Sequence, residues 1–303
     1  MTSAGSQGKE GSGLPFGLGA YLLWGLLPLY FKLLSIVGPV EIVANRILFS
    51  LVFLIGLLGA TGALGQFRAT LRDRTTMFSM TLSAVLIAVN WLAYVWAITN
   101  HHVVAASLGY FLNPLVNVMI GVVLLKESLR MPQKLAIGVA AIGVAVMATT
   151  ALATIWLSLL LAMSFAFYGY IRKTATVGPR QGLAAETLIL TPIALCYLAW
   201  LASHGGLHLG RDAMVTTLLV LCGLVTSLPL LLFATAARRM PLSTLGLLQY
   251  ISPTIQLLIG IFVFGENLNR GQIVSFALIW AGLAIYTFDS LRNARASRII
   301  AAN

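Results

Sequence analysis

The chain has 303 residues, of which 59% are hydrophobic and only 9% are charged. Soluble domains carry about 25% charged residues, so this chain could not cover a water-exposed surface of the size that its length implies. The net charge is +11. The basic residues occupy short gaps between apolar runs, which is a membrane-topology pattern and argues against nucleic acid as a partner. The composition predicts a helical protein embedded in a lipid bilayer.

Apolar runs long enough to cross a membrane recur along the whole chain. One helical span needs about 20 apolar residues, and the sequence predicts ten spans after a small, polar and disordered N-terminal stretch, 1–13. The fifth and sixth runs almost merge, so nine spans are the main alternative. A basic tail, 290–303, follows the last run. The predicted spans are 14–34, 40–60, 77–99, 103–125, 133–150, 153–171, 183–203, 214–236, 242–264 and 271–289.

The distribution of Lys and Arg sets the orientation of these spans. With ten spans, fifteen of the nineteen Lys and Arg residues fall on one side of the membrane, three fall on the other side, and Arg46 lies within a span. Loops rich in Lys and Arg stay in the cytoplasm. Nine spans would scatter the basic loops over both sides. The pattern therefore predicts ten spans, with both termini in the cytoplasm, in a multi-pass protein of the plasma (inner) membrane.

The sequence repeats itself weakly at an offset of 139 residues, and offsets of 140 and 141 extend the match to the earlier spans. A repeat of five spans is inverted in its second copy, because five is odd. Inverted repeats are typical of secondary transporters. We therefore expect an all-α membrane protein built from two inverted five-helix repeats, 14–150 and 153–289. The pairs matched at offset 139 include Pro114 with Pro253, Glu127 with Glu266, Gln133 with Gln272 and Gly143 with Gly282.

The fourth and ninth spans each place a proline beside amide side chains. Asn113, Pro114 and Asn117 lie in the fourth span, and Pro253 and Gln256 lie in the ninth. Proline frees a backbone carbonyl, so each span carries a polar patch within the membrane. This pattern predicts the wall of a cavity, with Pro114 and Pro253 as hinges. The alternative is a kink with close helix packing, since amides also join helices in membranes.

Aromatic and amide side chains on other spans complete this candidate cavity. Asn90, Trp91 and Tyr94 share one helix face, because residues three and four apart are neighbours on a helix. Such groups converging on a cavity suit an organic solute. The alternative is an interfacial aromatic belt or simple core packing. The full set of candidates from these faces is Trp24, Asn90, Trp91, Tyr94, Tyr110, Gln249 and Tyr250.

Two charged residues, Arg46 and Glu186, lie inside predicted spans at positions equivalent under an offset of 140. A charge within a membrane is costly and usually faces a cavity or a partner. An inverted repeat places the two at opposite depths, so each is expected near one mouth of the pathway. We assign Arg46 to the candidate cavity and Glu186 to ion coupling. The alternatives are snorkelling of Arg46 to the surface and an interfacial helix start at Glu186.

The sequence indicates no catalytic residue, cofactor or metal site. No Walker-type glycine loop is present, and the spans contain neither a His-Glu-x-x-His motif nor a pair of aspartates. The two cysteines lie in apolar runs and are read as reduced packing residues. The histidines fall in outer loops with a spacing that matches no closed ligand set; they are His101, His102, His204 and His208.

Several short motifs are similar to those of one transporter group. Asn90-Trp91, the stretch 106–111, Asn113-Pro114-Leu115 and the stretch 126–129 resemble the EamA branch of the drug/metabolite transporter superfamily. The stretch 249–254, Gly265-Glu266 and Pro229-Leu230 resemble its RarD subgroup. The resemblance covers about residues 15–290. It implies ten helices in two inverted halves, alternating-access transport of small solutes, and a central cavity formed partly by the fourth and ninth helices.

Together these observations predict a secondary transporter or exporter of small organic metabolites or drugs, with a solute and the lipid bilayer as its partners. Without an ATP-binding motif, the drive would come from an ion or solute gradient, and Glu186 makes protons the favoured ion. Sodium coupling and uncoupled exchange are alternatives. The alternative function classes are an intramembrane enzyme and a membrane assembly factor. No oligomeric state follows from the sequence.

Overall fold

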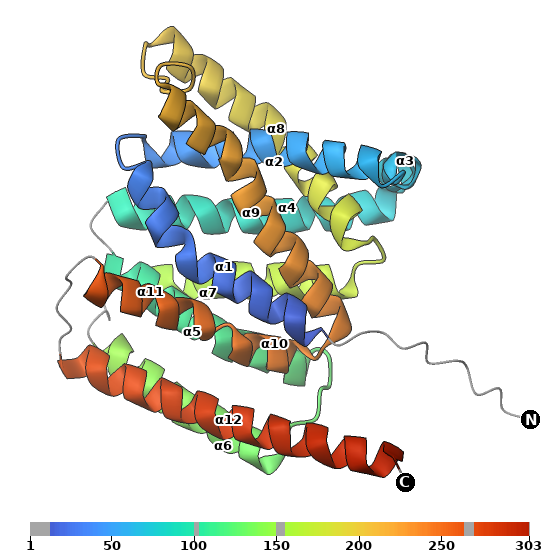
Figure 1. Ribbon diagram of the computed structural model, residues 1–303, viewed down its shortest axis with the longest axis vertical. Coiled ribbons are helices and arrows are strands. Elements are labelled where there is room, and N and C mark those ends of the chain that lie inside the picture. The colour runs from blue at the N-terminus through green and yellow to red at the C-terminus, as the bar shows by residue number, and fades with distance from the viewer. Residues whose placement is uncertain (1–12, 100–102, 150–154, 264–269, 303) are drawn as a thin grey trace, which may run out of the picture.

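A computed structural model describes residues 13–99, 103–149, 155–263 and 270–302. Over these ranges the chain forms twelve α-helices and contains no β-strand (Figure 1). The prediction of an all-α protein is confirmed. Of the predicted N-terminal stretch only Gly13 is described, and His101, His102 and Glu266 lie outside the described residues.

Nine of the ten predicted spans each correspond to one helix. The predicted span 242–264 is instead divided into two helices, and a short additional helix lies in the predicted gap 61–76. The helices are α1 (Leu14–Leu33), α2 (Pro39–Ala60), α3 (Leu64–Arg72), α4 (Arg74–Thr99), α5 (Val103–Val123), α6 (Met131–Ala148), α7 (Ile155–Thr174), α8 (Pro179–Ser203), α9 (Ala213–Arg239), α10 (Leu242–Leu248), α11 (Ile251–Phe262) and α12 (Arg270–Ala302).

Hydropathy and length identify the helices that can cross a bilayer. Among the described residues, seven helices qualify, namely α1, α2, α4, α6, α7, α8 and α9. Two shorter apolar segments, Leu108–Val123 and Ile273–Tyr286, lie within α5 and α12. Helix α12 continues to Ala302, so the predicted basic tail is helical through that residue. The fold is that of a multi-pass helical membrane protein.

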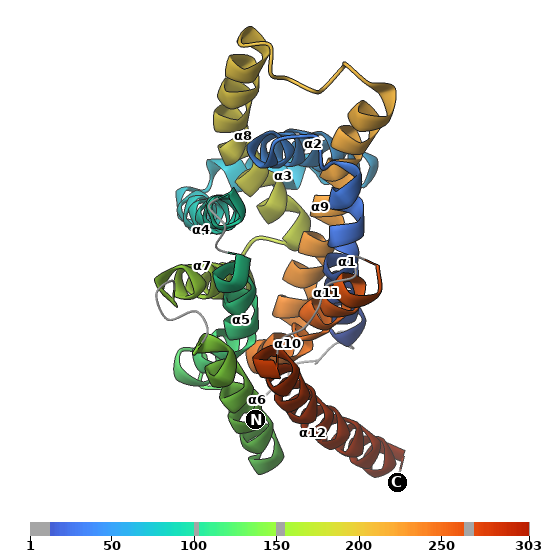
Figure 2. The same cartoon turned by 90° about the vertical axis from the view of Figure 1, so that its left-hand side faces the viewer.

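Helices from the first half of the chain pack mainly against helices from the second half. Helix α2 contacts α8 and α9, α1 contacts α9 and α11, and α5 contacts α7 and α10. Helix α4 contacts α7 and α8, while α6 lies along α12. Figures 1 and 2 show α6 and α12 at one end of the molecule and α8 rising at the other. The largest buried apolar cluster therefore lies in the contact between the halves, with side chains from α1, α2, α4, α7, α8 and α9.

Helices α2 and α9 approach each other most closely at Gly223. A methyl group on its Cα would overlap the backbone of Phe49, and the Ser50 hydroxyl donates to the Gly223 carbonyl at 3.2 Å. Small residues allow helix backbones to come this close in membranes, where packing and hydrogen bonds drive association. Gly223 thus sets the spacing between one helix from each half.

We expect Gly223→Ala to destabilise the bundle by about 1–3 kcal/mol, because the overlapping atoms belong to the backbone of α2, which cannot change rotamer to relieve the overlap. Thermal unfolding of the detergent-purified protein measures this loss. Gly56→Ala is the matched control, since Gly56 also lies in an apolar helix but a Cβ there meets nothing within 4 Å. Equal melting temperatures for the two variants would contradict the assignment.

Candidate functional site

An interior cavity of about 250 Å³ lies between the two halves of the chain. Helices α1, α2, α4 and α5 line it from the first half, and α7, α9, the α10–α11 junction and α11 line it from the second. On the first-half helices the lining residues fall toward the ends where α1 leads into α2 and where α4 leads toward α5. The cavity is therefore displaced from the middle of the bundle toward one side.

The cavity brings together most of the residues predicted to form it. Nine of the eleven predicted cavity residues line it, together with the predicted hinge Pro253. The predicted residues Asn117 and Tyr250 are buried just outside it, and neither Pro114 nor Glu186 is part of the lining. The nine are Trp24, Arg46, Asn90, Trp91, Tyr94, Tyr110, Asn113, Gln249 and Gln256.

The wall formed by the second half contains a break in the helix. Helix α10 ends at Leu248 and α11 begins at Ile251, so Gln249 and Tyr250 lie between them. The break precedes Pro253, which has no N–H to donate to the carbonyl of Gln249. Pro114, by contrast, lies within the continuous helix α5. The two predicted hinge prolines therefore have different surroundings.

Hydrogen bonds join the discontinuous helix to two neighbouring helices, α5 and α1. The Asn117 amide donates to Gln249 Oε1 at 2.9 Å, and the Tyr250 hydroxyl donates to the Phe111 carbonyl at 3.3 Å. Gln256 Nε2 donates to the carbonyl of Trp24 at 3.1 Å. These bonds tie α5 and α1 to the discontinuous helix. They also explain why Asn117 and Tyr250 lie behind the cavity wall, where they support it.

Arg46 is the only charged residue among those that line the cavity. Its Nε donates to Thr226 Oγ1 at 2.9 Å. The guanidinium carbon lies 4.9 Å from the Trp91 ring centroid and 5.6 Å from that of Phe31. No carboxylate of the described residues forms a salt bridge with it. Arg46 is thus held by a hydroxyl and two aromatic faces rather than by an opposite charge.

An aromatic cluster closes one side of the cavity. The Phe233 ring lies 5.6 Å from Trp24, 5.3 Å from Phe165 and 6.0 Å from Tyr168, measured between ring centroids. Phe233 and Tyr168 are fully buried. Both lie in the second halves of α9 and α7, toward the α9–α10 and α7–α8 connections. The cluster therefore separates the cavity from that end of the bundle.

Polar contacts tie the helices together beyond the aromatic cluster. The Glu127 carboxylate accepts hydrogen bonds from the backbone N–H groups of Leu242 at 2.7 Å and Ser243 at 3.0 Å, at the start of α10. It therefore satisfies amides that a helix N-terminus leaves free. Lys173 Nζ lies 3.9 Å from Glu127 and donates to the carbonyl of Met240 at 2.7 Å. The ends of α5, α7 and α9 and the start of α10 are thus linked.

Glu186 lies away from the cavity in a buried ion pair. Its Oε1 lies 3.3 Å from Arg172 Nη1 and accepts a hydrogen bond from Ser83 at 2.6 Å. Its Oε2 has no hydrogen-bond partner among the described residues. Arg172 also donates to the Pro179 carbonyl at 2.9 Å. The structure thus gives Glu186 a partner other than Arg46, with side chains from α4, α7 and α8.

The sequence analysis missed Arg172. We placed it in the gap 172–182 with the surface cations, whereas its side chain is only 1% exposed and belongs to the last turn of α7. Gly182 makes this possible, because a Cβ there would overlap the guanidinium. Gly182 lies one helical turn before Glu186 on α8. A glycine at this spacing leaves room for a large cation beside the acid, and it is the signal that could have revealed the Arg172–Glu186 pair. Arg46 is therefore not the only arginine inside the bundle.

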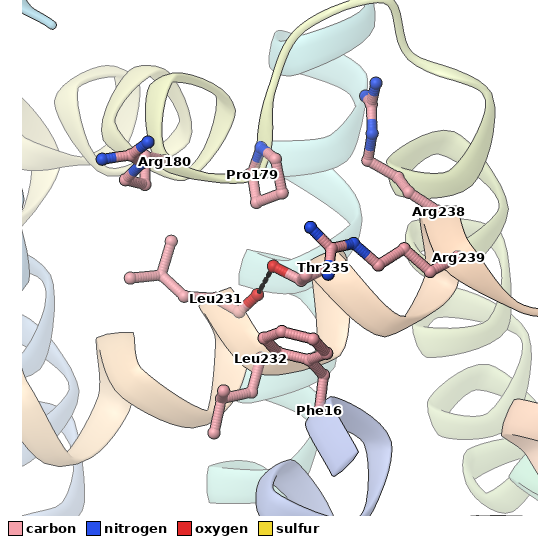
Figure 3. A pocket seen from close by; sticks show the side chains of 8 residues that line it. All are labelled: Phe16, Pro179, Arg180, Leu231, Leu232, Thr235, Arg238 and Arg239. Atoms are coloured by element: carbon pink, nitrogen blue, oxygen red, sulfur yellow. Dashed lines mark hydrogen bonds between the residues drawn. The ribbon is translucent and has the colours of Figure 1, made fainter. Parts of the chain in front are cut away.

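A larger groove of about 460 Å³ opens at the surface, between the starts of α1 and α8 and the end of α9. Figure 3 shows Arg180, Arg238 and Arg239 around it, with Phe16 below Arg239. The Arg239 guanidinium carbon lies 4.8 Å from the Phe16 ring centroid. All three arginines are exposed. The groove therefore belongs to the basic surface at this end of the bundle and is separate from the interior cavity.

Within the described residues, no group of three or more His, Cys, Asp or Glu side chains could hold a metal ion. His208 Nδ1 lies 2.8 Å from the buried carboxylate of Glu41, so this outer-loop histidine contacts α2. Cys196 and Cys222 are both free, and only Cys222 is buried. Cys222 thus packs as expected, whereas Cys196 faces outward from α8.

The sequence matches the model of the EamA-like transporter family twice, over residues 11–149 and 152–288. The chain belongs to this family. Relatives of the EamA-like chain include the protein RarD of Streptomyces exfoliatus, 44% identical over 97% of this chain and 93% of the relative. The protein RarD of Escherichia coli is 40% identical over 93% and 96% of the two chains. The predicted resemblance to the RarD subgroup is confirmed.

Other relatives add the class of activity and the fold. An uncharacterised transporter of Pseudomonas aeruginosa is 44% identical over 93% of this EamA-like chain and 95% of its own. A solved crystal structure superposes with a TM-score of 0.70 at 19% identity, over 91% of this chain and 97% of the other. At that identity the superposition supports the fold alone. The relatives support a membrane transporter rather than an enzyme.

The buried pair in this EamA-like protein is expected to behave as a unit. Breaking a buried ion pair costs about 3–5 kcal/mol, whereas replacing both partners with apolar residues is often neutral. We expect Arg172→Met and Glu186→Leu each to lower the melting temperature of the purified protein, and the double variant to recover most of the loss. Arg180→Met, at an exposed arginine of α8, is the control. Additive losses in the double variant would contradict the pairing.

Proposed function

We propose that this protein is a secondary transporter of small organic metabolites or drugs that works by alternating access. The observation that carries the proposal is the interior cavity, in which amides, aromatic rings and Arg46 converge beside a broken helix. Broken helices at a cavity between two halves are a recurring feature of secondary transporters. The RarD relatives and the family support the same class of activity.

We further propose ten spans arranged as two inverted five-helix halves, with α10 and α11 forming one span. The exchange of α1 with α7, α2 with α8, α4 with α9, α5 with α10–α11 and α6 with α12 leaves the contact pattern almost unchanged. Contacts of α1 with α9 and α11 then correspond to contacts of α7 with α4 and α5. The pairs α2–α8 and α6–α12 map onto themselves. This correspondence supports a two-fold axis between the halves.

The cavity's contacts suggest how access would alternate. The aromatic cluster around Phe233 and the Glu127–Lys173 contacts close the side toward the α7–α8 and α9–α10 connections. In the proposed orientation this is the cytoplasmic side, and the cavity faces the outer side. Opening toward the cytoplasm would require the ends of α7 and α9 and the start of α10 to separate, with the break at Gln249 and Tyr250 as the site of bending.

The proposed orientation places both termini in the cytoplasm of a cell with an inner membrane. Thr174 is the last residue of α7 and Ser203 is the last residue of α8, and both are exposed. The proposed orientation puts Thr174 on the cytoplasmic side and Ser203 on the outer side. In a background with Cys196→Ser and Cys222→Ala, we expect an impermeant maleimide to label Ser203→Cys on intact cells. Thr174→Cys should react only after the membrane is permeabilised. The reverse pattern would contradict the orientation.

Transport itself is tested by comparing the uptake and efflux of many metabolites in cells with and without the protein. We expect at least one small organic solute to move only when the protein is present, and Arg46→Ala and Glu186→Ala to reduce that movement. A solute identified in this way can then be followed in vesicles that contain the purified protein. If no solute moves in either system, the transporter proposal is wrong.

We propose protons as the coupling ion and Glu186 as the group that takes them up. Glu186 is buried, one of its oxygens has no hydrogen-bond partner among the described residues, and the charged or polar groups that face it are Arg172, Ser83 and the Tyr168 hydroxyl. Protonation would neutralise the carboxylate and free Arg172, which links proton uptake to the contacts that join the end of α7 to the start of α8 and to α4. The coupling step is therefore placed outside the solute cavity.

In vesicles with an imposed pH gradient, we expect Glu186→Gln to retain solute exchange. The solute accumulation driven by the gradient should fall at least tenfold, because the amide cannot titrate. Asp212→Asn is the control, since Asp212 caps α9 in a loop and asparagine caps equally well. If Glu186→Gln folds poorly, the Glu186→Gln/Arg172→Met double variant serves in its place. Unchanged accumulation in a folded variant would exclude Glu186 as the coupling site.

A further inference from the structure

We propose that the cavity recognises small organic anions, with Arg46 binding the solute's carboxylate or an equivalent acidic group. The proposal rests on the proposed transport function, in which the cavity is the solute site, and it adds the chemical class of the solute. It starts from the charge of the cavity wall. Among the residues that line the cavity, Arg46 carries the only formal charge.

A charge inside a membrane protein is usually paired with an opposite charge or faces water or a ligand. Arg172 follows this rule, because it is buried against Glu186 at 3.3 Å. Arg46 does not, since its contacts are a hydroxyl and two aromatic rings and no described carboxylate lies within salt-bridge distance. The described residues therefore supply no opposite charge at this site, and a bound anion would supply it.

The fixed orientation of the guanidinium favours a carboxylate in particular. Thr226 accepts from Nε, and the guanidinium carbon lies over the Trp91 and Phe31 rings, 4.9 and 5.6 Å from their centroids. The terminal nitrogens form no hydrogen bond with the described residues. An arginine fork binds a carboxylate through two parallel hydrogen bonds, which a single ammonium cannot do. Side chains that hold the arginine reduce the entropy lost when the fork closes on a ligand.

The rest of the cavity sets the size and polarity of the solute. Its volume of about 250 Å³ is below the ~300–1,000 Å³ typical of sites for drug-sized ligands. Tyr94 and Tyr110 form an edge-to-face pair with centroids 5.6 Å apart, and both line the cavity beside Trp91. Asn113 lines it too, and its Oδ1 has no partner among the described residues. These features fit a compact acid with an apolar or aromatic body.

Matched solutes separate the role of the charge from the role of the body. The test uses triplets of an acid, its amide and its amine, with linear, branched and aromatic bodies, for example phenylacetate, phenylacetamide and phenethylamine. Binding to the purified protein is measured by thermal stabilisation and by tryptophan fluorescence, since Trp24 and Trp91 line the cavity. We expect acids to bind about 10–100-fold more tightly than their amides, as hydrogen bonds to a charged group imply, and amines not to bind.

Variants then assign the preference to Arg46. Arg46→Gln should remove the advantage of the acid while leaving the amide's affinity within about threefold, and Arg46→Lys should keep part of the advantage. Arg180→Gln is the control, because it removes an exposed arginine of the surface groove (Figure 3) and should change nothing.

The inference is overturned if no acid in the panel binds more tightly than its amide, or if Arg46→Gln keeps the preference. Failure of the proposed transport function gives a different result. In that case acids bind with the expected preference, but vesicles that contain the wild-type protein do not move them.

Discussion

The hydrocarbon interior of a bilayer contains no water, so every polar group placed there needs a partner within the protein. Several buried side chains of the described interior find such partners on helices of the opposite half. Asn90 donates to the Leu161 carbonyl at 2.8 Å, and Tyr21 donates to the Leu245 carbonyl at 3.1 Å. Each of these bonds joins a helix of one half to a helix of the other. The polar side chains that fill the bundle thus also hold its halves together.

The same constraint explains why the break between α10 and α11 lies where it does. Backbone groups at the break keep short-range partners, since the Ser252 N–H donates to the Gln249 carbonyl at 3.2 Å and the Tyr250 N–H donates to the Leu247 carbonyl at 3.3 Å. The side chains there are paired as well, because the Asn117 amide donates to Gln249 Oε1 at 2.9 Å. Gly246 lets α10 approach α5 closely, since a Cβ there would crowd Asn117 and the carbonyl of Pro114. The equivalent helix of the first half, α5, is continuous, so the two halves share a sequence pattern and differ in shape.

Much of this architecture could be predicted, because hydropathy acts on each segment separately. Apolar runs located α2 to within one residue of its start at Pro39, but they placed the start of α8 at 183 instead of Pro179, because a Gly-Pro pair starts that helix before the apolar run begins. Most of the cavity residues could also be predicted, since amides and aromatics that share one face of an apolar helix are typical of a cavity wall. The division of the span 242–264 could not, because Pro253 and Pro114 have similar local sequences. Contacts from other helices decide which of the two prolines is accompanied by a break in its helix.

Arg172 and Arg46 show most clearly where sequence patterns stop being informative. A charged residue near the end of an apolar run usually reaches the surface, so Arg172 looked like one more cation of a basic loop. Its burial depends on Gly182, on another helix, which leaves room for the guanidinium. Arg46 lay deeper in its run and was recognised as internal, but its lack of an acidic partner could be seen only in three dimensions. Two buried arginines therefore have opposite meanings. The paired one joins the end of α7 to Glu186 of α8, and the unpaired one leaves the cavity with a positive charge that no described carboxylate neutralises.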